Sequence, residues 1–194
     1  MKIVVFPGVG ADVIKEPYEY FLDEIKRGLN CEGEIFVWEN GHKHPHVTPP
    51  FRSVRHFVCE TILDFQQVVV HAMEMQVPDA DIYIGHSAGS ILALAQNRPV
   101  VTFASPAALV ELIDATNETA KDCRVRLRAN NNKVLNIINK YDVIAYPING
   151  ENVENYEYSG PWYNPLTYFP VTAHTHYWRC EKAIDKIIKT IKSW

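Results

Sequence analysis

Residues 82–95 of the chain run Ile82-Tyr83-Ile84-Gly85-His86-Ser87-Ala88-Gly89-Ser90-Ile91-Leu92-Ala93-Leu94-Ala95. The apolar, β-branched start of this stretch is typical of a buried strand, and its second half consists of good helix formers. Between them, Gly85 and Gly89 flank Ser87 in the Gly-x-Ser-x-Gly pattern of a nucleophile elbow, in which a sharp turn projects the serine. The stretch therefore predicts a strand, a tight turn and a helix, with Ser87 at the turn.

The same alternation of strand and helix extends along the whole chain. Strands are predicted at residues 3–6, 34–38, 100–104 and 134–138, and helices at 12–29, 51–76, 107–115 and 180–191. Residues 146–170 are irregular and aromatic, which predicts a functional loop or a small hairpin. We therefore expect residues 1–194 to form one three-layer α/β domain, with a mostly parallel sheet covered by helices on both faces and little or no cap.

Composition limits the classes of function. Hydrophobic residues make up 47% of the 194 residues and charged residues 22%, which suits a globular protein with a sizeable core. The net charge is −4 and no basic cluster is present, so nucleic acid is not an expected partner. Because no stretch approaches the ~20 apolar residues of a membrane span, the protein is expected to have no transmembrane segment and to be soluble and cytoplasmic.

A serine nucleophile needs a histidine base and an acid, and both follow Ser87 in the order expected after an elbow. Asp142 comes just after the strand predicted at 134–138, and His174 precedes the last helix. His176 competes with His174, because it lies only two residues further on. The sequence thus contains a candidate Ser-Asp-His triad.

Three short motifs resemble those of the α/β-hydrolase superfamily, and within it the smaller lipases and esterases related to the fungal class three lipases. The motifs are Gly85-His86-Ser87-Ala88-Gly89, Asp142-Val143-Ile144 and His174-x-x-Tyr177-Trp178. The chain departs from many relatives at Pro7, where they have histidine before the glycine of the first turn.

The resemblance implies a serine esterase of lipase type. Ser87 would be the nucleophile, His174 the general base and Asp142 the residue that orients the imidazole. Ala88 and Val9 would supply the N–H groups of the oxyanion hole, with Gly8 and Gly10 as alternatives to Val9. The implied substrate is a small-molecule carboxylic ester, cleaved without a cofactor or a metal ion. A thioesterase or another acyl hydrolase, and a non-catalytic binding protein of the same fold, remain alternatives.

Other residues have weaker functional interpretations. The aromatic residues before His174 either border the acyl pocket, with Trp162 and Tyr163 as candidate substrate-binding residues, or form a satellite core; the others are Tyr156, Tyr158, Tyr168 and Phe169. His42, His44 and His46 alternate as metal ligands can, but no acidic ligand motif accompanies them, so a loop without a metal is expected. Gly8-x-Gly10 lacks the third glycine of a dinucleotide-binding turn, which disfavours a nucleotide-binding protein.

Overall fold

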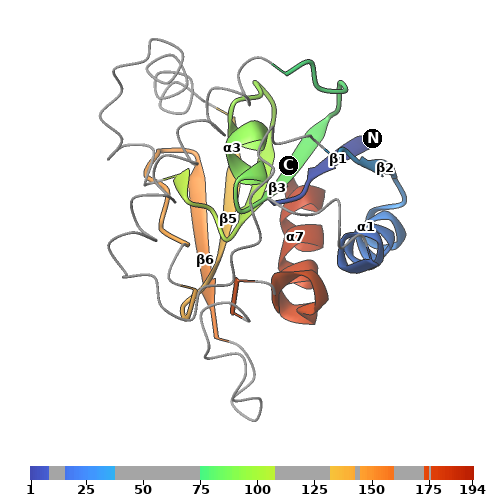
Figure 1. The fold of residues 1–194 in the computed structure, drawn as a ribbon. Coiled ribbons are helices and arrows are strands. Elements are labelled where there is room, and N and C mark those ends of the chain that lie inside the picture. The colour runs from blue at the N-terminus through green and yellow to red at the C-terminus, as the bar shows by residue number, and fades with distance from the viewer. Residues whose placement is uncertain (9–15, 38–74, 108–131, 143–144, 160–172, 175) are drawn as a thin grey trace, which may run out of the picture.

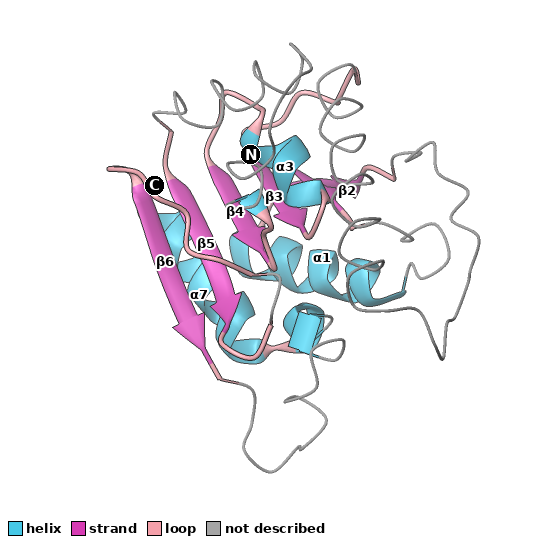
Figure 2. Cartoon of the chain, turned by 60° about the vertical axis from the view of Figure 1, so that its left-hand side comes forward, coloured by secondary structure: helices cyan, strands magenta, loops and turns pink. Residues whose placement is uncertain are grey.

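The computed structural model describes residues 1–8, 16–37, 75–107, 132–142, 145–159, 173–174 and 176–194. Their helices and strands are β1 (Lys2–Phe6), α1 (Glu16–Leu29), β2 (Glu32–Ile35), β3 (Ile82–His86), α3 (Gly89–Leu94), β4 (Val100–Phe103), β5 (Val134–Asn139), β6 (Val153–Tyr158), the 3₁₀ helix η2 (His176–Arg179) and α7 (Glu181–Ser193). The strands form one sheet in the order β2-β1-β3-β4-β5-β6, and every neighbouring pair is parallel. Figure 2 shows β3, β4, β5 and β6 side by side in this order.

Two hydrophobic cores cover the two faces of the sheet. One core joins β-strand residues to α1, η2 and α7, and is filled by fully buried side chains such as Phe21, Phe103 and Ile187. The other core joins the opposite face of the strands to α3 through Ile91 and Leu92. Figure 1 shows α1 and α7 next to each other, away from α3. The predicted three-layer α/β fold with a parallel sheet is confirmed.

The strand order changes direction at the pair β1 and β3. From β1 the chain first adds β2 on one side, and then returns to add β3 and the later strands on the other side. In open parallel sheets, a crevice for ligands forms at such a point, beyond the carboxyl ends of the two strands. Here those ends are Phe6 in β1 and His86 in β3, and Ser87 is the next residue after β3.

The interior strands were predicted well, and the two edge strands were not. The second strand was predicted at 34–38, but β2 is Glu32–Ile35, and its first residue pairs with Lys2. Residues 146–170 were expected to be irregular or a hairpin, yet they contain β6, which pairs in parallel with β5. Edge strands are only partly buried, so apolar patterning does not mark their ends clearly.

Some predicted segments lie outside the described residues. These include nearly all of the helices predicted at 51–76 and 107–115, the start of the first helix at 12–15, and the segments from which a cap could come. In the part of the chain that is described, no helix is long and apolar enough to cross a membrane.

Candidate active site

Ser87 occupies a strained turn at the carboxyl end of β3. Its φ is 51°, in the left-handed region that residues with a Cβ seldom adopt. The flanking glycines are required by close packing: a Cβ on Gly85 would lie 2.5 Å from the Gly89 oxygen, and one on Gly89 would lie 2.3 Å from the Phe6 oxygen. Ser87 itself remains partly exposed. The turn therefore has the geometry of a nucleophile elbow, as the sequence predicted.

Hydrogen bonds on the buried side hold this turn in place. The Ser87 N–H donates to the Phe103 carbonyl at 3.0 Å, and the Ser90 hydroxyl donates to the Ser87 carbonyl at 2.6 Å. Because the Ser90 hydrogen is used in this way, the Ser105 hydroxyl must be the donor in the 2.8 Å bond between the two serines. Both serines are fully buried. Sequence reasoning missed them, because a serine in a helix or loop carries no local signal of such pairing.

Asp142 and His174 are in direct contact, although 32 residues separate them. The Nδ1 of His174 lies 3.0 Å from Oδ2 of Asp142, whose side chain is completely buried, while the His174 side chain is 17% exposed. Asp142 follows β5 and is fixed by its own N–H, which donates to the Asn139 carbonyl at 2.8 Å. A carboxylate on Nδ1 places the proton on that nitrogen and leaves Nε2 as the acceptor.

His86 links the elbow to the loop that carries His174. Its Nε2 lies 2.9 Å from the His174 carbonyl oxygen, which can only accept, so Nε2 carries the proton. The two imidazole rings are 4.9 Å apart. On the other side of His86, a Cβ on Gly8 would lie 3.1 Å from Nδ1 and 3.0 Å from the Ser87 Cβ. Thus Ser87, His174 and the first turn surround one buried histidine.

Burial, and to a smaller extent the nearby His174, lower the pKa of His86 to about 3. In the unfolded chain the pKa of His86 is near 6.5. Below that pH the unfolded state binds a proton on His86 that the folded state does not bind. The free energy of unfolding should therefore fall as the pH falls, by as much as ~1.4 kcal/mol per pH unit between about 6.5 and 4.

His86→Gln removes this titration but keeps a side-chain donor. Denaturant unfolding at several pH values should give a shallower acid dependence for the variant than for the wild type. Equal slopes for the two proteins would show that His86 is not the group responsible.

The remaining predicted site residues are placed as follows. Ala88 is buried at the start of α3, and its N–H has no acceptor among the described residues. His176 is in η2, and its ring lies 6.4 Å from that of Tyr158 rather than on Asp142. Val9, Trp162 and Tyr163 lie outside the described residues, as do His42, His44 and His46.

The aromatic segment before His174 is divided between two roles. Tyr156 and Tyr158 belong to β6, and Tyr158 packs against Tyr177 in the core. For these two residues both interpretations are wrong, because they belong to a strand and join the main core of the sheet rather than a loop or a separate satellite core.

Hydrogen bonds join Asp142 to His174 and His174 to His86 in the elbow, but they do not include every contact of the predicted triad. Between Ser87 and His174, which are both described, there is no hydrogen bond. Catalytic hydrogen bonds often tighten only when substrate binds. Within the described ranges, no group of three or more His, Cys, Asp or Glu residues could hold a metal ion.

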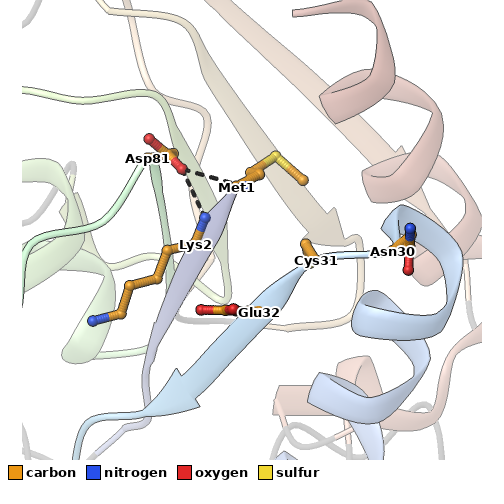
Figure 3. A pocket seen from close by; sticks show the side chains of 6 residues that line it. All are labelled: Met1, Lys2, Asn30, Cys31, Glu32 and Asp81. Atoms are coloured by element: carbon orange, nitrogen blue, oxygen red, sulfur yellow. Dashed lines mark hydrogen bonds and ion pairs between the residues drawn. The ribbon is translucent and has the colours of Figure 1, made fainter.

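A hollow lies at the end of the sheet where β1, β2 and β3 begin. Figure 3 shows its lining residues, which are Met1, Lys2, Asn30, Cys31, Glu32 and Asp81. Asp81 accepts the Lys2 N–H at 2.7 Å and lies 3.9 Å from the amino group of Met1, so its charge is already paired. The hollow is at the amino ends of the strands, whereas Ser87 follows the carboxyl end of β3.

Comparison with known proteins adds structural neighbours but no sequence relative. No family model and no curated protein matches the sequence. Among solved structures, the chain is similar to a candidate cell surface hydrolase from Lactobacillus plantarum WCFS1, with 12% identity and a TM-score of 0.42, over 100% of this chain and 90% of that one. It is also similar to an esterase domain of a Rhodothermus marinus protein, with 14% identity and a TM-score of 0.37, over 81% of this chain and 75% of that one.

The fold assignment rests on the strand order and on the sharp turn at Ser87 after β3. The sheet is parallel throughout, the elbow follows β3, Asp142 follows β5, and His174 follows β6. This is the chain order of nucleophile, acid and histidine in α/β-hydrolases. The protein has an α/β fold of the α/β-hydrolase type.

Proposed function

We propose that this protein is a serine hydrolase that cleaves carboxylic esters through an acyl-enzyme on Ser87. The observation that carries the proposal is the hydrogen bond between His174 Nδ1 and the buried carboxylate of Asp142. A second hydrogen bond, from His86 to the His174 carbonyl, links His174 to the strained turn that carries Ser87. A buried carboxylate on a histidine beside a serine in an elbow is the arrangement that activates a hydroxyl for attack.

In the proposed reaction, His174 Nε2 takes the hydroxyl proton while Ser87 Oγ attacks the ester carbonyl. The imidazolium that forms is stabilised by the negative charge of Asp142, which does not take up the proton. His174 then returns the proton to the leaving alcohol, so that the ester C–O bond breaks and the acyl group remains on Ser87. Water, activated by the same imidazole, releases the acid and restores the serine.

The developing oxyanion needs donors that are already oriented toward it. The Ala88 N–H is one proposed donor, since it follows the nucleophile and is not used by the described residues. A second donor from the first turn, Val9, completes the proposed hole. Trp162 and Tyr163 are proposed to contact the acyl group. A cytoplasmic location of the protein is also a prediction.

The choice of base is tested by comparing two neighbouring histidines. His174→Ala should lower kcat on nitrophenyl esters by roughly 10⁴-fold or more, because Asp142 holds the imidazole of His174 directly. His176→Ala is the matched control and should cause a far smaller loss, since that ring packs against Tyr158.

Each outcome of this comparison has a distinct meaning. Equal losses, or a larger loss for His176→Ala, would move the base to His176. A wild-type protein that turns over none of the esters, at any acyl length, would favour the non-catalytic alternative instead.

A further inference from the structure

Tyr177 is a buried side chain that contacts the acid of the candidate triad. It lies in η2 with none of its surface exposed. Its hydroxyl oxygen accepts the Asn139 N–H at 2.8 Å, and its hydroxyl hydrogen is donated to Asp142 Oδ2 at 3.0 Å. Since a hydroxyl has only one hydrogen, the bond from Asn139 fixes the direction of the donation toward Asp142.

Two donors therefore meet on one carboxylate oxygen. Oδ2 of Asp142 also takes the bond from His174 Nδ1, at 3.0 Å. Burial and the adjacent Asp142 raise the pKa of Tyr177, so its hydroxyl keeps its proton throughout the physiological range and remains a donor. Both donors are attracted by the negative charge of the same carboxylate oxygen, so the hydrogen bond from Tyr177 affects the hydrogen bond from His174.

Resting on the proposed function, we propose that Tyr177 is a positioning residue that acts through Asp142. It fixes the carboxylate against β5 and takes up part of its charge, which limits how strongly Asp142 favours the imidazolium form of His174. The base thereby stays neutral, and able to accept a proton, at a lower pH than it would beside a carboxylate without this partner.

Few other titratable groups face His174 among the described residues. His86, from β3, is the nearest, with its ring 4.9 Å away, and it stays neutral above about pH 3. Asp142 contacts His174 directly, and Tyr177 acts through that carboxylate. The hydrogen-bonded route from Tyr177 to the imidazole of His174 thus runs through Asp142.

Tyr177→Phe removes the donor and keeps the ring. NMR titration of the imidazole C–H signals, assigned with His174→Gln, should show the pKa of His174 raised by about half a unit to one unit. The acid limb of kcat/KM should move in the same direction.

The matched control is Tyr158→Phe, because Tyr158 is also buried and packs edge-on against Tyr177, with the two ring centres 5.6 Å apart. Its hydroxyl has no nitrogen or oxygen partner among the described residues. The control should leave the titration unchanged.

A second variant keeps the test valid if Tyr177→Phe does not fold, since that change leaves the Asn139 N–H without its acceptor. Fluorinated tyrosine incorporated at position 177 retains both hydrogen bonds and is a stronger donor. It should shift the pKa of His174 downward, opposite to the effect of phenylalanine, whereas a purely structural role predicts no such reversal. An unchanged His174 titration in the fluorinated protein would overturn the inference.

The titration requires no turnover, so failures of the two proposals are distinguishable. If the pKa of His174 responds to Tyr177 but wild-type protein hydrolyses no ester, the positioning role stands and the proposed function fails. If hydrolysis depends on Ser87 but the titration does not respond, only the inference about Tyr177 fails.

Discussion

Ser87→Ala is expected to abolish ester hydrolysis while leaving the fold intact. The hydroxyl is the proposed attacking atom, and neither Asp142 nor His174 can replace it as the group that carries the acyl chain. Alanine has a Cβ like serine, so it adds no new strain at a φ of 51°. The hydrogen bonds that hold the turn use the Ser87 backbone, which the substitution preserves.

Two measurements check this expectation. Turnover of nitrophenyl esters should fall to the background rate in the variant, and a fluorophosphonate probe should label the wild type at Ser87 but not the variant. Ser90→Ala is a useful control, because the Ser90 hydroxyl is buried and donates to the Ser87 carbonyl, so the probe should still label this variant at Ser87. Retained turnover by folded Ser87→Ala protein would remove Ser87 as the nucleophile.

Asp142→Asn should have the second largest effect, lowering kcat by as much as ~10⁴-fold, the loss seen when this role is removed in other triads. The amide has no charge with which to stabilise the imidazolium of His174. If its NH₂ group faces Nδ1, it also imposes the wrong tautomer. KM should change only a few-fold where it reports binding, because the substitution leaves apolar substrate contacts in place.

The control for this change is another carboxylate in the same part of the chain. Glu151 is exposed in the turn before β6, and Glu151→Gln should leave kcat close to the wild-type value. Near wild-type kcat in folded Asp142→Asn protein would contradict the assignment of the acid. Glu151 and Asp122 would then be the next candidates.

The interior of the sheet could be predicted because its strands are buried on both faces. β1, β3, β4 and β5 consist almost entirely of buried residues, and such strands appear in a sequence as continuous apolar runs. The edge strands are different. In β6, Glu154, Asn155 and Glu157 alternate irregularly with tyrosines, so the segment resembles a polar loop until β5 provides a partner for its backbone.

The hydrogen-bond partners of buried polar residues also could not be predicted from the sequence. Asn136 is fully buried in β5, where its side chain accepts from the Thr102 hydroxyl at 2.8 Å and donates to Asn155 at 2.8 Å. An asparagine in an apolar run carries no local sign of such partners, because they come from the neighbouring strands. The sequence pattern alone therefore identifies the strand but not its polar cross-links.

By itself, the sequence determined the order of the elements, the parallel interior strands and the elbow at Ser87, since each depends on residues adjacent in the chain. Asp142 and His174 were chosen as candidates by their order after the elbow. Only the tertiary structure decided that Asp142 contacts His174, that His86 joins the elbow to His174, and that Tyr177 shares the carboxylate. These contacts join residues that the sheet brings together from distant positions, and hydrogen bonds of 3 Å depend on that packing rather than on local sequence.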